Sequence, residues 1–165
     1  MDTTESLYEG HYLRLKKRGN WEYAERTHAG SAVIIIAITP EENLLFVEQY
    51  RVPMNANTIE MPAGLVGDQD ENDTFESAAV RELLEETGWQ ADEVKVLMIG
   101  PSSAGMSNEI IAFARARNLT RIHAGGGDEY PAATPIGILH ILDCRGRRPV
   151  CGRDPRLERY AKCLE

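Results

Sequence analysis

The stretch from residue 73 to residue 88 constrains the fold most, because its pattern predicts one well-capped amphipathic helix over 74–87. Asp73 can cap the N-terminus of this helix, and Glu76 three residues later completes a pair that resembles a capping box. Apolar residues recur at helical spacing: Phe75, Ala78, Ala79 and Leu83. Gly88 stands where a helix commonly ends in a left-handed residue. The chain must therefore fold so that another element covers the apolar stripe.

The same helix carries three carboxylates, Glu82, Glu85 and Glu86, whose spacing places them on one side within about one turn. Like charges this close repel, and Arg81 alone lies beside them to offset the charge. A hard divalent cation would stabilise the group, because such ions prefer carboxylate oxygens and bridge to phosphates. A solvated acidic face is the alternative, and the three carboxylates by themselves favour it.

Length and charge limit the classes of function. At 165 residues the chain is expected to form one domain, 1–165, with a buried core. Its net charge of -8 argues against a nucleic-acid-binding surface. The longest apolar run, Ala32 to Ile38, is typical of a buried strand and too short to span a membrane.

The first five residues are polar and acidic and do not resemble a signal peptide. We therefore expect a cytoplasmic protein whose cysteines are reduced thiols. These are Cys144, Cys151 and Cys163, and their spacing matches no zinc-site pattern.

Short apolar runs predict strands on both sides of the helix, at residues 31–38, 44–51, 58–61, 94–100, 109–117 and 136–142. The turn at 39–43 predicts that 44–51 returns as the hairpin partner of 31–38. A weak terminal helix is expected at 154–164, within a basic tail that holds the cysteines. Strands interleaved with one strong helix indicate an α/β (α+β) fold, a sandwich around a mixed β-sheet.

The helix and the loop before it resemble the signature motif of the Nudix hydrolase family. Gly67 is followed by five residues, Asp73, seven residues and then REUxEExGU at 81–89, where U is a bulky apolar residue. One fixed position differs, since Asp73 stands where Glu is usual. Relatives commonly place the motif glycine in an Ala-Gly pair, here Ala63-Gly64, which would give this loop three extra residues. The resemblance extends roughly from residue 8 to residue 129 and implies a Nudix-type α/β/α sandwich.

Nudix enzymes hydrolyse a nucleoside diphosphate linked to another group, using a divalent metal. The resemblance implies four metal ligands: Glu82, Glu86, Glu85 and the Ala63 carbonyl. Glu85 is expected to bind the metal or its water, with Mg2+ as the cofactor and Mn2+ as the alternative. Arg81 is expected to orient these carboxylates, although a simple surface salt bridge competes with this role. Gly88 is expected to be structural.

Outside the motif, the chain resembles the branch that hydrolyses ADP-ribose and other nucleotide sugars. The resemblance implies substrate-binding roles for Arg51, Trp21, Glu109 and Ser103. The Arg51 guanidinium can donate two parallel hydrogen bonds to a phosphate or ribose. An arginine at the end of a surface strand without any binding role explains the sequence equally well. Trp21 matches an aromatic that stacks on the base, often from the partner subunit of a dimer, whereas a lone Trp is more often core or interface.

Catalytic roles are implied for Glu82, Glu85 and Glu129. Glu129 ends a glycine-rich loop and matches a general base in some relatives, though many such loops have no function. Pro131 stands where relatives show a second loop carboxylate, and Ala104 stands where many have a proline. Residues 131–135 stand where the resemblance implies a strand, but they begin and end with proline and are not expected to form one. The hypothesis that follows is that the tail 130–165 is a diverged or frame-shifted end.

We therefore expect Mg2+-dependent hydrolysis of the pyrophosphate bond of ADP-ribose or a related nucleoside diphosphate sugar, giving a nucleoside monophosphate and a sugar phosphate. The alternatives are another nucleotide substrate, such as a triphosphate or dinucleotide, and a weakly catalytic nucleotide-binding sensor. By resemblance the chain is expected to form a homodimer through residues 1–30, with 7–18 as a swapped strand. No nucleic acid and no membrane is expected as a partner.

Overall fold

The computed structural model describes residues 3–68, 72–126 and 137–143. In chain order its elements are β1 (Thr4–Glu9), β2 (Leu13–Arg18), β3 (Trp21–Arg26), β4 (Ser31–Ala37), β5 (Asn43–Arg51), the 3-10 turn η1 (Val52–Met54), β6 (Ala56–Glu60), β7 (Ala63–Val66), α1 (Phe75–Thr87), β8 (Trp89–Pro101), β9 (Ile110–Arg121) and β10 (Gly137–Asp143).

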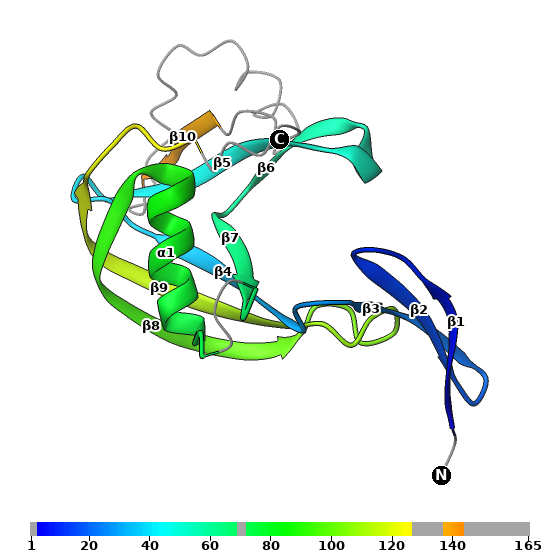
Figure 1. Ribbon diagram of the computed structural model, residues 1–165. Coiled ribbons are helices and arrows are strands. Elements are labelled where there is room, and N and C mark those ends of the chain that lie inside the picture. Colours follow the sequence, from blue (N-terminus) through cyan, green and yellow to red (C-terminus); the bar gives the residue numbers. More distant parts are fainter. Residues whose placement is uncertain (1–2, 69–71, 127–136, 144–165) are drawn as a thin grey trace.

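The described strands form three sheets, with orders β1-β2-β3, β10-β5-β6 and β7-β4-β9-β8. In the four-stranded sheet β4 and β9 are parallel and the other pairs are antiparallel, so the sheet is mixed. Figure 1 shows α1 lying across this sheet, while the sheet of β1, β2 and β3 projects away from it. The predicted fold class, α+β around a mixed sheet, is confirmed.

The hydrophobic core lies between α1 and one face of the four-stranded sheet. Alternate residues of β4 and β9 are fully buried there: Val33, Ile35, Ala37, Ala112, Ala114 and Ala116. From α1 come Ala78, Ala79 and Leu83, which belong to the predicted apolar stripe. Facing alanines have little side chain to hold helix and sheet apart, so the two can pack closely. The packing leaves the carboxylate-bearing side of α1 next to β7.

The N-terminus of α1 differs from the prediction. Thr74 is the N-cap, and Thr74 and Ser77 form a reciprocal capping box in place of Asp73 and Glu76. Asp73 instead accepts hydrogen bonds from Ser77 and Arg81. A hydroxyl cap satisfies the first helical amides equally well, which leaves the Asp73 carboxylate available to bind Arg81. The C-terminal prediction is confirmed, because Gly88 has φ 73°.

The predicted hairpin between 31–38 and 44–51 is wrong. Beyond a single bridge between Ile38 and Leu44, β5 pairs with β6 and β10 and not with β4. Both edges of β4 are already occupied, one by β7 and the other by β9. Since a strand has only two edges, β5 cannot pair along β4. It belongs to another sheet, in which it forms a hairpin with β6.

The remaining strand predictions are confirmed with changed bounds. β6, β8 and β9 correspond to the predicted strands at 58–61, 94–100 and 109–117, with β6 ending one residue earlier and β9 beginning one residue later, and β8 and β9 are longer than expected. The run at 136–142 corresponds to β10. β7 was not predicted, because no strand was expected between 58–61 and the helix.

Several predictions fall outside the described residues. These are the roles of Glu129 and Pro131, the terminal helix at 154–164, and the state of the cysteines. A second helical layer, as in an α/β/α sandwich, is not present among the described residues. No helix in the described part of the chain is long and apolar enough to cross a membrane.

Candidate active site

Arg81 connects the carboxylates of α1 to the loop that precedes the helix. Its Nη1 donates to Oε1 of Glu82 at 2.7 Å and lies 3.7 Å from Oε2 of Glu85. Its Nη2 donates to Asp73 Oδ2 at 3.1 Å and to the Leu65 carbonyl at 3.2 Å. With partners on α1, on β7 and in the loop, Arg81 is more than a simple surface salt bridge. It holds two of the three acidic side chains in place.

Asp73, which stands at the motif position usually held by Glu, contacts Arg81 in the structure. Burial opposes ionisation of Asp73, but hydrogen bonds from Ser77 and Arg81 outweigh it and hold the pKa of this carboxyl below its usual range. Asp73 thus remains a carboxylate that can neutralise Arg81. The shorter side chain still reaches the arginine, so the departure from the motif does not disrupt this contact.

Glu86 contacts the backbone of β7. Its Oε2 accepts a hydrogen bond of 3.1 Å from the Ala63 amide, which places it at the start of β7. The pKa of Glu86 is raised to about 7, first by burial and then by the nearby charge of Glu82, although the amide of Ala63 and the charge of Arg51 oppose the rise. A buried carboxylate of this kind is stabilised by binding a cation.

Glycine at position 64 allows Glu82 to lie against the backbone of β7. A Cβ added to Gly64 would be 1.9 Å from Cδ of Glu82. Gly67 has open space around it and is instead required by its backbone, with φ 80°. Of the two candidate motif glycines, Gly64 is therefore the one that makes room for a predicted metal ligand.

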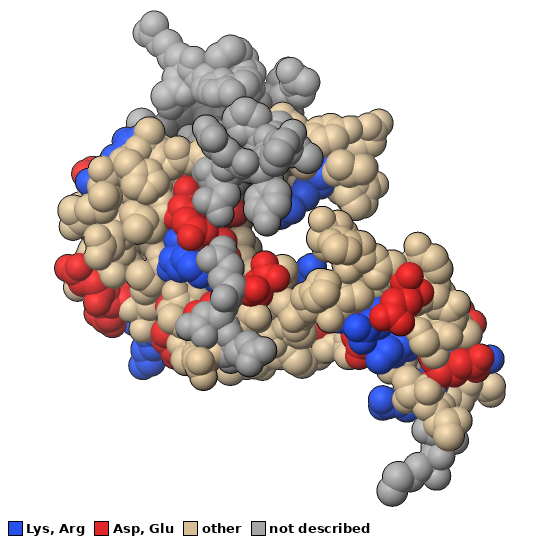
Figure 2. All heavy atoms as spheres, in the orientation of Figure 1, with Lys and Arg blue, Asp and Glu red and all other residues tan. Residues whose placement is uncertain are grey.

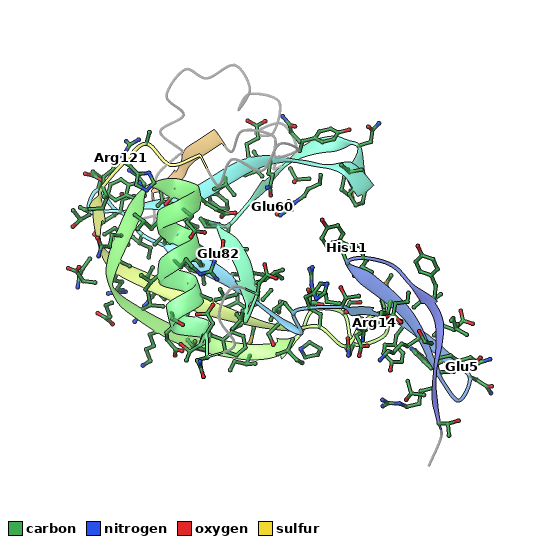
Figure 3. The ribbon with its side chains drawn as sticks, viewed as in Figure 1. Glu5, His11, Arg14, Glu60, Glu82 and Arg121 are labelled. Atoms are coloured by element: carbon green, nitrogen blue, oxygen red, sulfur yellow. The ribbon has the colours of Figure 1, made fainter. Side chains whose placement is uncertain are left out.

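Arg51 ends β5 on the same hairpin that leads into β7. Its Nε and Nη2 donate to the two carboxylate oxygens of Glu60 at 2.9 and 2.6 Å. Pairing with Glu60 raises the pKa of Arg51, and pairing with Arg51 lowers that of Glu60. Figure 3 shows Glu60 below the hairpin and Glu82 on the side of α1 turned toward it.

Sequence reasoning missed Glu60. The available signal was the position of Glu60 in a strand that follows Arg51 after a short turn. In an antiparallel hairpin, such residues can lie on one face.

The other predicted substrate residues gather at a second location. Trp21 donates from Nε1 to the carbonyl of Gly105 at 3.0 Å. The carbonyl of Ser103 accepts from the amides of Met106 and Ser107 within the same turn. Glu109 pairs with Arg26 of β3 at 2.6 Å. These contacts join the β8–β9 loop to the N-terminal sheet, away from α1 in Figure 1.

A cavity of about 810 Å³ opens at this second location. Its lining includes aromatic and basic side chains of the N-terminal sheet: Lys16, Arg18, Trp21 and Tyr23. A surface of this composition suits a base and a phosphate. Figure 2 shows acidic and basic side chains interspersed on the visible face, both over α1 and over the N-terminal sheet.

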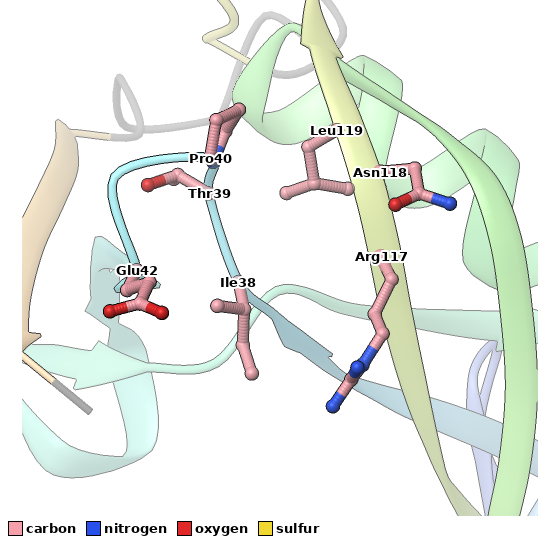
Figure 4. Close-up of a pocket in the computed structure, with 7 residues that line it drawn as sticks. All are labelled: Ile38, Thr39, Pro40, Glu42, Arg117, Asn118 and Leu119. Carbon is pink, nitrogen blue, oxygen red and sulfur yellow. The ribbon is translucent and has the colours of Figure 1, made fainter. Parts of the chain in front are cut away.

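A further cavity of about 470 Å³ lies where the β4–β5 turn meets the end of β9 (Figure 4). It is lined by Ile38, Thr39, Pro40, Glu42, Arg117, Asn118 and Leu119. No residue with a predicted role in catalysis or binding lines it. The predicted site residues thus occupy two regions, α1 with the β5–β7 segment and the N-terminal sheet with the β8–β9 loop.

The oxygen donors of the α1 region suit a hard divalent cation. Among the described residues no three His, Cys, Asp or Glu side chains are already grouped to hold an ion. Arg81 bonds Glu82 and lies near Glu85, so the acidic side chains are neutralised by a cationic side chain in this arrangement. The donor chemistry of this region fits a divalent metal, with Glu82, Glu86 and the Ala63 carbonyl as the oxygen donors that would hold it.

The comparison with known protein families decides how these features are interpreted. The model of the NUDIX domain matches residues 28–129, which include Arg51, the β5–β7 segment and the whole of α1. The chain belongs to the Nudix family. Members of this family generally use divalent cations, in agreement with the oxygen donors on α1.

Curated relatives of this Nudix protein carry different names. A methanol dehydrogenase activator of Bacillus methanolicus is 32% identical over 133 residues, which are 76% of this chain and 70% of that protein. An ADP-ribose pyrophosphatase of Bacillus subtilis is 34% identical over 56% of this chain and 48% of its own length. An ADP-sugar pyrophosphatase of Mus musculus is 30% identical over 56% of this chain and 44% of its own length. The chain therefore spans about half of each of these two pyrophosphatases.

A solved structure described as an ADP compounds hydrolase shares the fold. It superimposes with a TM-score of 0.69, covering 98% of this chain and 88% of the other, at 19% sequence identity. At that identity the likeness concerns the fold. It supports the arrangement of the helix against the mixed sheet.

Proposed function

We propose that this Nudix protein hydrolyses the pyrophosphate bond of ADP-ribose or a related nucleoside diphosphate sugar, releasing a nucleoside monophosphate and a sugar phosphate. The observation that carries the proposal is the Arg51 guanidinium, which Glu60 holds on the hairpin that leads into β7, where the Ala63 amide bonds Glu86. In this proposal Arg51 binds a phosphate of the substrate next to the acidic side chains of α1. The names of the relatives from Bacillus subtilis and Mus musculus support the same substrate class.

In the proposed reaction each residue of the α1 region has a separate role. Glu82 and Glu86 would hold a divalent cation, Mg2+ in the cell, with the Ala63 carbonyl as a further ligand. Such a cation would supply positive charge to offset the negative charge of the diphosphate. Arg51 binds a phosphate oxygen and orients the diphosphate. Arg81, held by Asp73, keeps Glu85 and Glu82 in place.

Glu85 is the candidate general base among the described residues. Water attacks one phosphorus atom, its proton passes to the Glu85 carboxylate, and the bond from that phosphorus to the bridging oxygen breaks. The second phosphate leaves with the bridging oxygen. Glu85 suits this role because its side chain is about one-third exposed and its nearest cation, Arg81, is 3.7 Å away. Glu129, the other candidate base, lies outside the described residues.

The base and ribose of the substrate are assigned to the second region. Trp21 supplies a stacking surface, and Glu109 and Ser103 lie on the loop beside it. We further propose that the protein is a cytoplasmic homodimer, in which the N-terminal sheet of one subunit brings this region to the α1 region of its partner. The exposed apolar side chains of that sheet support this: Leu7, Tyr8, Tyr12, Leu13 and Leu15.

The test is a hydrolysis screen with Mg2+ over ADP-ribose, other nucleotide sugars, dinucleotides and nucleoside triphosphates. We expect turnover of nucleotide sugars that requires the metal and stops on chelation. If the protein prefers triphosphates or dinucleotides, the proposed substrate class is wrong, whereas the proposed pyrophosphate hydrolysis is retained. Tight binding of a nucleotide sugar without any hydrolysis would instead favour a sensor.

A further inference from the structure

The Arg51–Glu60 pair is a feature that the motif does not explain. In the β5–β6 hairpin Arg51 lies opposite Ala56, and Glu60 lies opposite Val47. Arg51 and Val47 are four residues apart on one strand, so Arg51 and Glu60 occupy the same face. The Arg51 side chain lies back along the hairpin to reach the carboxylate.

The geometry of the pair leaves part of the guanidinium free. Glu60 takes the edge formed by Nε and Nη2, in a two-bond fork. A guanidinium has five N–H donors, and a fork of this kind uses two. Among the described residues nothing bonds Nη1 of Arg51, and the side chain is 45% exposed. The second edge is therefore open to an anionic ligand.

The backbone that follows Glu60 connects the pair to a predicted metal ligand. The charge of Arg51 lowers the pKa of Glu86 and the charge of Glu60 raises it. The chain then continues from Glu60 through the buried Pro62 to Ala63, whose amide bonds Glu86. Pro62 is itself held, because its carbonyl accepts from the amide of Ile35 in β4 at 2.8 Å. Glu60 thus stands on backbone that is fixed to the core.

A role in stability alone does not account for the pair. Half-exposed ion pairs contribute only about 0–1 kcal/mol to folding. The two side chains are 45% and 31% exposed, so little stability is gained by holding a long side chain in one conformation. Holding Arg51 does, however, remove the cost of ordering it when a ligand binds.

We propose that Glu60 is a positioning residue for diphosphate binding. It occupies one edge of the Arg51 guanidinium and so presents the other edge to a phosphate of the substrate. It also neutralises Arg51 while no substrate is bound and keeps this cation from pairing with Glu86. This inference deepens the proposed function and rests on it, but the role concerns the diphosphate group, which every candidate substrate contains.

The test is a double-mutant cycle on the full-length chain with four variants: Glu60→Gln, Arg51→Ala, the double variant, and Glu93→Gln as the matched control. Glu93 is an exposed strand carboxylate on β8. The probe is inorganic pyrophosphate at micromolar concentration with Mg2+, and its dissociation constant is measured by calorimetry. Thermal unfolding of each variant shows whether the fold is retained.

We expect Glu60→Gln to weaken pyrophosphate binding by about tenfold, with a change in melting temperature of no more than about 2 °C. Arg51→Ala should weaken binding at least as much. The double variant should bind as Arg51→Ala does, because Glu60 acts only through Arg51. Glu93→Gln should bind as the wild type does. Turnover of ADP-ribose by Glu60→Gln should show a raised KM with kcat within about twofold of the wild type.

Three results would overturn the inference. One is an unchanged dissociation constant in Glu60→Gln, the second is a double variant in which the two losses multiply, and the third is a large loss of kcat with KM unchanged. Failure of the wild type to hydrolyse nucleotide sugars would reject the proposed substrate instead. The pyrophosphate cycle would then still decide the role of Glu60, because it requires no turnover.

Discussion

At the scale of single residues, Glu86 combines a functional position with a cost to folding. Burial raises its pKa from 4.5 to about 7. Between these two values the folded chain binds more protons than the unfolded chain, so this group lowers the free energy of unfolding as the pH rises. Above pH 7 the loss is complete, and a shift of this size corresponds to on the order of 3 kcal/mol. Sites that bind charged ligands often retain such destabilised groups.

Glu86→Gln should separate stability from function. Without metal at pH 8, we expect a melting temperature several degrees above that of the wild type, because the buried charge is gone while the side chain can still accept from Ala63. At pH 5 the two proteins should melt at nearly the same temperature. Mg2+ should stabilise only the wild type, and kcat of the variant should fall by on the order of 100-fold. A variant that is less stable than the wild type at pH 8 would contradict the role of burial.

Gly64→Ala tests the close approach between β7 and Glu82. The added Cβ would meet the end of a flexible side chain, so we expect Glu82 to move and the backbone to stay in place. The melting temperature should change by less than about 3 °C, whereas kcat/KM should fall by at least about tenfold as a metal ligand is displaced. Gly30→Ala is the matched control, since nothing lies within 4 Å of its added Cβ. Full activity of Gly64→Ala would rule out the position assigned to Glu82.

At the scale of elements, the end of α1 depends on the segment that follows β9. The amides of Ile122 and His123 donate to the carbonyl of Gly88, and the amide of Gly126 donates to that of Glu86. These bonds satisfy carbonyls that the end of a helix leaves without partners. They also tie the last turn of α1, with its acidic side chains, to backbone that leads toward residue 129.

Gly88→Ala should destabilise the protein without any direct effect on the chemistry. Gly88 has φ 73°, and an added Cβ would lie 2.1 Å from the His123 carbonyl oxygen, which is backbone and cannot easily move. We expect a loss of more than about 2 kcal/mol and a melting temperature lower by about 5–10 °C. Gly100→Ala, in open space on β8, is the control. Equal melting temperatures for Gly88→Ala and Gly100→Ala would contradict the packing described at this helix end.

At the scale of the whole molecule, the N-terminal sheet stands apart from the α1 layer (Figure 1). It contacts the rest of the described chain near the β8–β9 loop, where the amide of Ala24 donates to the carbonyl of Met106. Large apolar side chains remain exposed on it, including Tyr12 at 73% and Leu13 at 51%. Exposed apolar groups gathered on one element are typical of an interface.

Leu13→Glu therefore tests the proposed homodimer. We expect the wild type to sediment as a dimer at micromolar concentration and the variant as a monomer, since a buried charge would oppose association. If Trp21 serves the site of the partner, KM for the nucleotide sugar should rise about tenfold on dissociation. Ile122→Glu, which replaces an exposed apolar residue far from this sheet in the sequence, should remain dimeric. A monomeric wild type would reject the dimer.

Helix α1 and its acidic side chains were predictable because they depend on short-range spacing. Positions i, i+3 and i+4 share one side of any helix, so Glu82, Glu85 and Glu86 had to lie together once residues 75–87 were helical. The N-cap was missed because Asp73 and Thr74 both suit that position. The choice between them depends on Arg81, which draws Asp73 to itself.

By itself, the sequence determined the family motif, the helix that carries it and the strands that flank it, since these depend on local spacing and apolar pattern. The tertiary structure decided which strands pair, because β5 leaves β4 only when β7 and β9 occupy both of its edges. It also decided that Arg51 meets Glu60 and that the Ala63 amide meets Glu86. Such contacts depend on sheet register and layer packing, which join residues far apart in the chain.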